Sequence, residues 1–233
     1  METQFDRETM LLGEDALLRL QKAHVAVFGI GGVGSYTAEA LARAGVGRLT
    51  LIDNDVVSLT NLNRQLIALH STVGQNKTDV MAARIRDINP ACKVVSLPRM
   101  YTPESREDFF SLGFDYIADA IDSVSCKLDL IETALARKVP IISSMGTGNR
   151  LDPSKFVITD LSKTSGDPLA RVMRSELRKR GIVHHTVLYS TELPRPVSAP
   201  ADGRRSVPGS VSWCPSVAGL MIAGYIVQKL IKE

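Results

Sequence analysis

The sequence contains few cysteines, few aromatic residues and no long apolar run. Three cysteines in 233 residues exclude a disulfide scaffold, and no two of them have the C-x-x-C spacing of a zinc pair, so we expect no structural zinc. Aromatic residues make up 5% of the chain, so the core must be mainly aliphatic. The longest uncharged apolar run, Val217–Val227, is shorter than the roughly 18 residues that a membrane span needs.

The N-terminal residues carry Glu2 and Asp6 and no apolar stretch, so we expect no signal peptide. Scarce cysteine suits a reducing compartment, and we expect a cytoplasmic protein without membrane association. The net charge of +3 alone does not indicate nucleic-acid binding. With 44% hydrophobic and 23% charged residues, the composition is that of a folded globular protein.

Strand-like and helix-like segments alternate along the first two-thirds of the chain. The predicted strands are His24–Gly29, Arg48–Asp53, Lys93–Leu97, Asp115–Ala120 and Pro140–Ser144, and the predicted helices are Gly32–Ala44, Lys77–Ile88, Pro103–Leu112 and Ser123–Arg137. This order predicts an α/β fold with a Rossmann-like, mostly parallel sheet and helices on both faces.

The last third has a different pattern. It predicts strands Phe156–Leu161 and Thr186–Thr191 flanking a helix Pro168–Arg180, and a final helix Ser216–Ile231. Five prolines between residues 194 and 215 predict a long irregular loop before that helix. Because no linker separates these parts, we expect a single domain over residues 1–233.

A glycine-rich motif, GIGGVG at Gly29–Gly34, follows the first predicted strand and opens the first predicted helix. Its G-x-G-x-x-G spacing comes from Gly29, Gly31 and Gly34, with Gly32 as an extra glycine. Glycines let the backbone approach a phosphate, and a helix N-terminus offers free N–H groups to that anion. Asp53 ends the next strand, where a carboxylate can bind ribose hydroxyls. The motif therefore predicts a nucleotide site, although a tight turn without a ligand has the same local pattern.

The residues after Asp53 favour ATP over a nicotinamide cofactor. Arg64 and Lys77 provide two cations, which a dinucleotide pyrophosphate does not require. Reaction at the α-phosphate of ATP moves charge onto both the attacked group and the leaving pyrophosphate, and Arg and Lys suit the neutralisation of that charge. Either residue could instead be a solvated surface cation.

Four segments together, GIGGVG, LIDNDVVSLTNLNRQ, VGQNK and DAIDS, resemble the ThiF/MoeB superfamily, relatives of the ubiquitin-activating enzymes. Members use ATP to adenylate a carboxylate and release pyrophosphate. The resemblance implies an ATP-binding core over about residues 1–145 and a substrate and dimer region over about 146–233. It implies a homodimer in which Arg7 acts on the ATP of the partner subunit, and it makes Arg64 and Lys77 catalytic. Asp122 is implied both as a catalytic residue and as the Mg²⁺ ligand. The implied nucleotide-binding residues are Gly29, Gly31, Gly32, Gly34, Asp53, Asp55, Asn61, Asn63, Gln65 and Ser123.

The two C-x-x-C zinc pairs of sulfur-carrier activators are absent, but further segments match another branch. LDP at Leu151–Pro153, TDLSKT at Thr159–Thr164 and DPLA at Asp167–Ala170 resemble the tRNA threonylcarbamoyladenosine dehydratases. That branch activates the threonyl carboxylate of a modified tRNA adenosine with ATP, and an intramolecular nucleophile then closes a ring. This chemistry requires no protein nucleophile, and Cys126 and Cys214 are expected to be buried.

Two other functions remain open from sequence. One is adenylation of the C-terminal glycine of a ubiquitin-like sulfur carrier, for which a sulfurtransferase-type protein would be a partner. The other is a nucleotide-binding module without catalysis.

The segment Lys163–His185 supports a tRNA partner. It carries six Lys or Arg residues against two acids, a net charge of +4, which exceeds the charge of the whole chain. Basic residues on one helix face are typical of phosphate contacts, and His184 and His185 would add charge when protonated. The alternative is an ordinary solvated face. The candidate tRNA-binding residues are Lys163, Arg171, Arg174 and Arg178.

Overall fold

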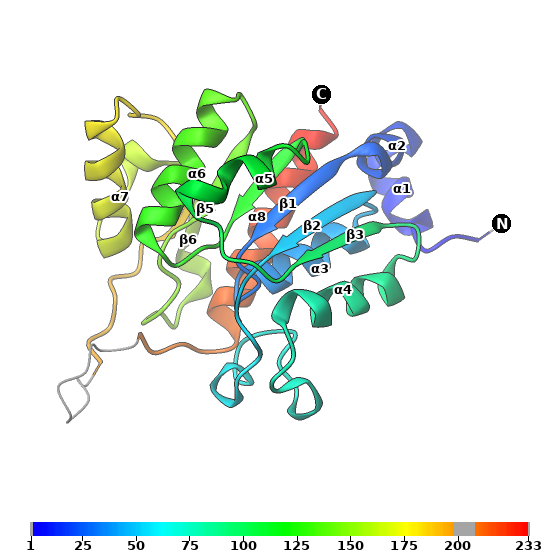
Figure 1. Cartoon of the computed structure of the whole chain (residues 1–233), viewed down its shortest axis with the longest axis horizontal. Helices are drawn as coiled ribbons and strands as arrows, with labels where there is room; N and C mark the ends of the chain where they lie inside the picture. Colours follow the sequence, from blue (N-terminus) through cyan, green and yellow to red (C-terminus); the bar gives the residue numbers. More distant parts are fainter. Residues whose placement is uncertain (1, 198–207, 233) are drawn as a thin grey trace.

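The computed structural model describes residues 2–197 and 208–232 (Figure 1). A seven-stranded sheet forms the centre, and its strands are β1 (His24–Phe28), β2 (Arg48–Ile52), β3 (Lys93–Leu97), β4 (Tyr116–Asp119), β5 (Ile141–Ser144), β6 (Phe156–Asp160) and β7 (Thr186–Ser190). Their order across the sheet is β3-β2-β1-β4-β5-β7-β6. All neighbours pair in parallel except β6 and β7, which pair antiparallel. The predicted mostly parallel α/β sheet is confirmed.

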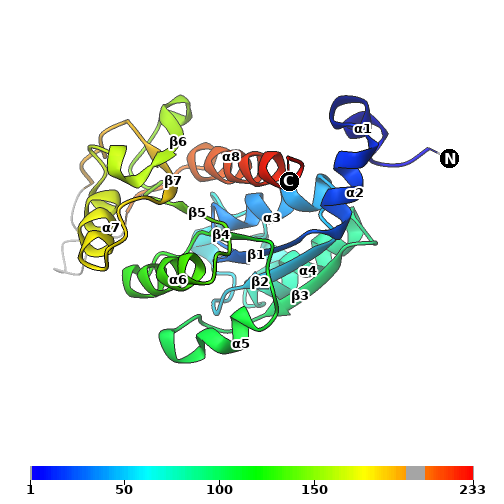
Figure 2. The same ribbon diagram turned by 90° about the horizontal axis from the view of Figure 1, so that it is seen from above.

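Helices cover both faces of this sheet, as Figure 2 shows for α8 and α6. The helices are α1 (Asp6–Leu12), α2 (Glu14–Lys22), α3 (Gly34–Arg43), α4 (Lys77–Ile88), α5 (Arg106–Phe110), α6 (Val124–Ala136), α7 (Pro168–Lys179) and α8 (Trp213–Leu230), with short 3₁₀ turns such as η1 (Leu59–Asn61) between them. Within the described residues, no helix is both long and apolar enough to cross a membrane.

Strand β1 shows how the two faces are built. Its side chains are all buried, and they alternate between two cores because successive residues of a strand point to opposite faces. Val25 and Val27 join the core formed with α3, α4 and α8, whereas Ala26 and Phe28 join the core formed with α5, α6 and α7. A strand buried on both faces therefore reads as a continuous apolar run.

The helices of the structure differ in part from the sequence predictions. Helices α1 and α2 were not predicted, and α1 buries none of its residues, so it has no apolar stripe to detect. Helix α8 begins at Trp213 rather than Ser216, because the first turn of a helix tolerates a proline such as Pro215. Residues 198–207 of the predicted proline-rich loop, with Arg204 and Arg205, lie outside the described residues.

The strand order creates a switch point between β1 and β4. Chain connections run outward through β2 and β3 on one side and through β5 on the other. In open α/β sheets, ligands bind in the crevice at the carboxyl ends of the strands at such a point. The fold therefore predicts where a site should lie.

Candidate active site

A cavity of about 760 Å³ lies at the carboxyl ends of β1, β2, β4 and β5. Its lining includes the glycine motif, the residues that follow β2, and those that follow β4 and β5. In Figure 1 this edge of the sheet faces the loops after β2 and the segment that leads into α8. Sequence-predicted residues that line the cavity are Gly29, Gly31, Gly32, Asp53, Asp55, Asn61, Arg64, Gln65, Lys77, Asp122 and Ser123.

The glycines of the motif have different roles. A Cβ at Gly34 would lie 1.7 Å from the carbonyl oxygen of Gly29, and a Cβ at Gly29 would lie 2.6 Å from the carbonyl oxygen of Ala120. These two glycines are required by backbone packing. A Cβ at Gly31 would meet only the Gln65 Nε2 atom, at 3.8 Å. The protein's own packing therefore does not require a glycine at position 31, and its missing side chain leaves room in the cavity.

Asp53 connects the end of β2 to the glycine motif. Its Oδ2 accepts a hydrogen bond of 2.6 Å from the Ile30 N–H, and its Oδ1 accepts one of 2.8 Å from the Asp55 N–H. Burial raises the pKa of the Asp53 carboxyl, and the charge of Lys77 partly offsets that effect. Each carboxylate oxygen has a second lone pair, so Asp53 can still accept hydrogen bonds from a ligand.

Two cations approach the cavity from the segments after β2. The buried Lys77 Nζ lies 2.6 Å from Oδ2 of Asp55, whose side chain is 61% exposed. The Arg64 Nη1 donates to the Thr60 carbonyl at 2.8 Å and to Asn63 Oδ1 at 3.0 Å. Within the described residues, the other guanidinium nitrogens of Arg64 have no hydrogen-bond partner. Both side chains are thus held by the protein and keep free donors for an anion.

Buried amides lie beside these cations. Asn61 Oδ1 accepts from the Ser58 N–H at 3.0 Å, which fixes the η1 turn that precedes Arg64. Gln65 is buried beside Gly31, and among the residues that the structure describes its Oε1 has no hydrogen-bond partner. Native structures rarely leave a buried polar atom unpaired, so this amide fits a site whose polar ligand completes its hydrogen bonds. Gly31, where a side chain would have space, and the unpaired Gln65 amide oxygen thus lie side by side in the cavity lining.

Asp122 is exposed and lines the cavity. In the described part of the chain its carboxylate has no hydrogen bond or ion pair. The turn that carries it is fixed by a fully buried ion pair, in which Lys127 Nζ lies 2.7 Å from Asp119 Oδ2. Asp119 Oδ1 also accepts from the Ile121 N–H at 3.1 Å. The contacts of Asp119 therefore fix the turn, and the turn presents the unpaired Asp122 carboxylate to the cavity.

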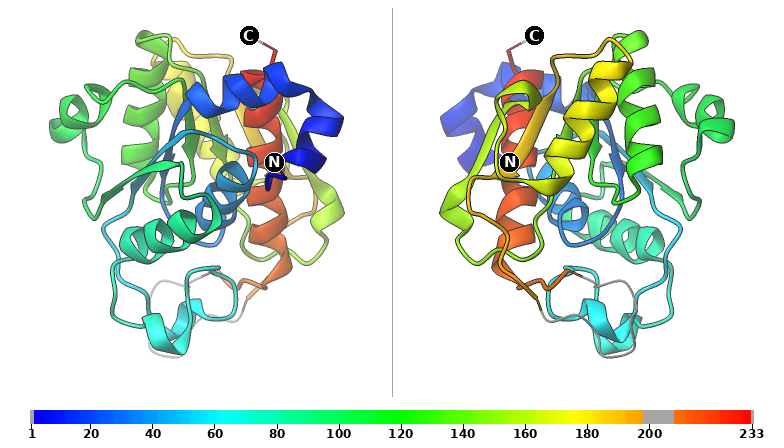
Figure 3. Two further views of the ribbon diagram at one scale, coloured as in Figure 1. Left: turned by 90° about the vertical axis from the view of Figure 1, so that its right-hand side faces the viewer. Right: turned by 90° about the vertical axis from the view of Figure 1, so that its left-hand side faces the viewer.

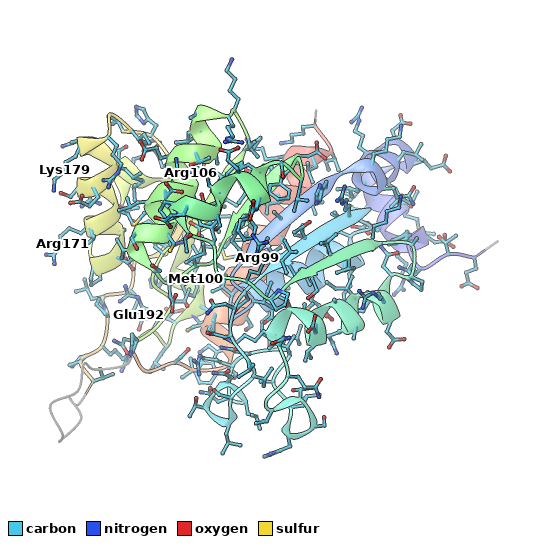
Figure 4. All side chains as sticks on the ribbon, viewed as in Figure 1. Arg99, Met100, Arg106, Arg171, Lys179 and Glu192 are labelled. Atoms are coloured by element: carbon cyan, nitrogen blue, oxygen red, sulfur yellow. The ribbon has the colours of Figure 1, made fainter. Side chains whose placement is uncertain are left out.

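Two lining segments were not found from the sequence. Arg99–Tyr101 follows β3, and Figure 4 shows Arg99 and Met100 on the connection to α5. Met145–Thr147 follows β5, whose last residue Ser144 also lines the cavity, and Leu169 at the start of α7 joins this segment. Neither segment contains a motif. The one available signal was their position directly after parallel strands, whose carboxyl ends share one edge of the sheet.

Several predicted residues lie outside the cavity lining. Gly34 acts in backbone packing, and the Asn63 Nδ2 donates to the Ser210 carbonyl at 2.9 Å. Arg7 lies in a separate surface hollow with Tyr36 and Leu220, so it does not reach the cavity of its own chain.

The predicted tRNA-binding residues also lie away from the lining. Lys163, Arg171 and Arg178 are exposed. Arg174 is half-buried, and its Nη1 donates to the Thr164 carbonyl at 2.9 Å.

His185 does not contribute positive charge to this region, contrary to the sequence prediction. It is buried, and its Nε2 lies 2.8 Å from the Ser143 hydroxyl. Burial, and then the charge of Lys127, lower the pKa of His185 to about 3. His185 is therefore neutral at neutral pH, whereas His184 is exposed and lies 3.2 Å from Asp160. The prediction for His185 was wrong because local sequence does not show burial.

Comparison with known proteins relates this site to one family. The ThiF family model matches residues 5–233. A tRNA threonylcarbamoyladenosine dehydratase of Bacillus subtilis is 47% identical over 99% of this chain and 95% of its own length. Crystal structures of E. coli tRNA N6-threonylcarbamoyladenosine dehydratase, TcdA, cover 98% of this chain and 94% of their own. The complex with ATP has a TM-score of 0.89 at 38% identity, and the complex with AMP has a TM-score of 0.90 at 39% identity. This chain therefore belongs to the ThiF family, in the branch that contains the tRNA threonylcarbamoyladenosine dehydratases.

Proposed function

We propose that this protein is an ATP-dependent enzyme that cyclises the threonylcarbamoyl group of a modified tRNA adenosine. One observation carries the proposal: a single cavity combines the glycine motif with Arg64, Lys77 and Asp122. A dinucleotide site would need the glycines and Asp53 but not this charged set. The Bacillus subtilis relative, which is 47% identical over 99% of this chain, carries the same activity in its name.

The cavity accommodates ATP across the switch point of the sheet. The phosphates bind over Gly31 and Gly32 at the N-terminus of α3, where free N–H groups favour an anion. Asp53 binds the ribose hydroxyls. The adenine packs against the apolar part of the lining, where the Met100 side chain is 49% exposed.

The proposed reaction has two steps. A carboxylate oxygen of the threonyl group attacks the α-phosphorus of ATP, and the bond to pyrophosphate breaks, which leaves an acyl adenylate on the tRNA. An atom of the same modified nucleoside then attacks the acyl carbon, loses its proton, and expels AMP. The AMP carries away the carboxylate oxygen, so the tRNA loses one water overall. No protein nucleophile takes part.

Arg64 and Lys77 act electrostatically in the first step. Negative charge moves from the attacking carboxylate to the leaving pyrophosphate, and fixed cations stabilise that redistribution without reorganising. Arg64 is held through one nitrogen and has other donors free for phosphate oxygens. Lys77 keeps two of its three N–H donors while it pairs with Asp55.

Asp122 is the residue that would hold Mg²⁺. In the described residues no three His, Cys, Asp or Glu side chains form a metal cluster. Mg²⁺ in nucleotide sites needs no such cage, because one carboxylate, phosphates and waters complete its shell. An unpaired carboxylate at the cavity wall fits that requirement, and the ion would supply charge neutralisation at the phosphates.

The modified nucleoside reaches the cavity from α7. Leu169 in the first turn of α7 lines the cavity, so the helix starts at the site and runs away from it. Figure 4 shows Arg171 and Lys179 on the outer side of this helix. With Lys163 and Arg178, Arg171 offers cations to the phosphates of tRNA, while Arg174 stabilises the segment before α7 through Thr164. Residues 146–233 thus form the substrate region of a single domain.

A homodimer is part of the proposal. Met10 and Leu11 of α1 are 85% and 84% exposed, and Leu220 of α8 is 48% exposed. Figure 3 shows α1 and α2 beside the C-terminal half of α8, and Glu8 of α1 lines the same surface hollow as Leu220 of α8. Arg7 lies in the same area and is free to act in a second copy. Light scattering on wild type and on a Met10→Glu/Leu11→Glu variant tests this: a wild-type monomer at every concentration would remove the dimer and the role of Arg7.

The test of the function is ATP cleavage that depends on the modified tRNA. We expect equal amounts of AMP and pyrophosphate with tRNA that carries the threonylcarbamoyl group, and none with the same tRNA lacking it. AMP formation with a ubiquitin-like sulfur carrier instead would support that alternative and its sulfurtransferase-type partner. ATP binding without cleavage under any of these conditions would support a binding module.

A further inference from the structure

Asn149 has an unusual backbone conformation and an unusual set of partners. Its φ of 58° is in the left-handed region, which asparagine tolerates better than most residues. Its N–H donates to the Gly209 carbonyl at 2.7 Å, and its side-chain Oδ1 accepts from the Gly209 N–H at 2.7 Å. Its carbonyl accepts from the Arg195 N–H at 2.9 Å. One residue thus binds both ends of the segment between β7 and α8.

These two ends lie side by side on the residues that follow β5. A Cβ at Gly209 would lie 3.5 Å from Val197 Cγ1, and a Cβ at Gly148 would lie 2.8 Å from Pro208 Cβ. In Figure 1 the described ends of this segment lie close to each other at the lower left of the molecule. Pro208 and Ser210 line the cavity, and Asn149 does not. By binding Gly209 between them, Asn149 fixes this part of the cavity wall.

The same contacts continue to Arg64. Ser210 follows Gly209, and its carbonyl accepts from Asn63 Nδ2 at 2.9 Å. Asn63 Oδ1 in turn accepts from Arg64 Nη1 at 3.0 Å. Within residues 2–197 and 208–232 these are the two hydrogen bonds of the Asn63 side chain. Arg64 Nη1 also donates to the Thr60 carbonyl, so one of its two hydrogen bonds leads back through Asn63, Ser210 and Gly209 to Asn149.

We propose that Asn149 is a positioning residue for the adenylation step, acting through Gly209, Ser210 and Asn63 on Arg64. The inference rests on the proposed role of Arg64. Nothing in the sequence connects these residues, since Asn149 and Arg64 lie far apart along the chain. A shift of about 1 Å in a catalytic group can cost roughly 100-fold in rate, so a small displacement of Arg64 would be measurable.

Two substitutions separate positioning from folding. Asn149→Gly keeps the left-handed backbone without strain and removes the Oδ1 acceptor. Asn149→Asp keeps an acceptor for the Gly209 N–H and is the matched control. We expect Asn149→Gly to lower the single-turnover rate of AMP formation roughly 10- to 100-fold. ATP affinity should change less than about twofold, and Asn149→Asp should retain most of the rate. A merely structural role would lower rate and affinity together, with a loss of thermal stability, and would overturn the inference.

A double-substitution cycle tests the connection to Arg64. Asn63→Ala should cause a loss of rate similar to that of Asn149→Gly. The combined variant should be no slower than the slower single variant, because both break one chain of contacts. Multiplicative losses would show independent effects and would contradict the proposal.

A measurement without tRNA keeps this inference separate from the proposed function. The side-chain Nε–H resonance of Arg64, followed by NMR with ATP bound, should shift in the same way in Asn149→Gly and Asn63→Ala and remain unchanged in Asn149→Asp. If wild type releases no AMP with modified tRNA, the proposed function fails, yet common shifts still support the positioning role. An unchanged Arg64 resonance in Asn149→Gly would overturn that role whatever the activity.

Discussion

Two glycines of the same motif should respond in opposite ways to alanine. At Gly34 the added methyl would lie 1.7 Å from the Gly29 carbonyl oxygen, so the main chain must move. Substitutions that force such a rearrangement in a core cost about 4 kcal/mol or more. We therefore expect Gly34→Ala to unfold at much lower denaturant or to fail to accumulate as a folded protein.

At Gly31 the methyl would meet only Gln65 Nε2, at 3.8 Å, and the backbone does not require a glycine. The stability of Gly31→Ala should stay within about 1 kcal/mol of wild type. The methyl would instead occupy the space that a phosphate approaches. Overpacking of this kind costs about 1–3 kcal/mol, which corresponds to ATP binding weakened roughly 5- to 150-fold.

Denaturant unfolding and calorimetric titration with ATP measure both effects on the same preparations. The pair is informative because each variant adds one methyl group to the same loop. ATP affinity at the wild-type level in Gly31→Ala would refute the assignment of this loop to the phosphates. A wild-type unfolding midpoint in Gly34→Ala would refute the packing argument.

Three further predictions concern charge. Arg64→Ala and Lys77→Ala should each lower the turnover number for AMP formation on the order of 100-fold and change ATP affinity much less. In steady-state kinetics, a raised KM with unchanged turnover would instead mean that the residue binds the ground state and the transition state equally. Neutralising Arg171 and Arg178 together should weaken tRNA binding and lower the slope of log affinity against log salt by about 0.7–0.9 per lost contact, with ATP titration unchanged; an unchanged salt slope would make this face ordinary surface. Because the folded-state pKa of His185 is depressed to about 3, the unfolded state binds more protons between that value and about 6.5. The free energy of unfolding should therefore decrease as the pH is lowered from about 6.5 toward about 3. His185 contributes at most about 1.4 kcal/mol per pH unit to the slope of the free energy of unfolding against pH. His185→Gln should therefore flatten this curve, and an unchanged curve would assign the acid sensitivity to another group.

The sequence predicted the parts of the structure that have a local pattern. Strand β1 is a continuous apolar run because both of its faces are buried, and the glycine motif follows it because the strand-to-helix turn itself requires Gly29 and Gly34. Helix α1 has no such pattern, since it buries no residue, and it was missed.

The remainder of the site depends on contacts between distant segments. Residues after β3 and β5 line the cavity only because the strand order places their ends at one edge of the sheet, which local spacing does not reveal. Arg174 shares a face with Arg171 in sequence spacing, yet the buried Met173 next to it brings it to the edge of the core. Helical spacing gives the angular separation of side chains but not which direction faces the core.

Mass spectrometry of tRNA nucleosides measures the proposed cyclisation itself. Purified protein, ATP, Mg²⁺ and tRNA carrying the threonylcarbamoyl group are incubated, and the nucleosides are then released and weighed. We expect the modified adenosine to become lighter by one water, with one AMP formed for each nucleoside converted, and Arg64→Ala to abolish most of the conversion. An unchanged modified nucleoside, alongside intact binding of ATP and tRNA, would contradict the proposed cyclisation.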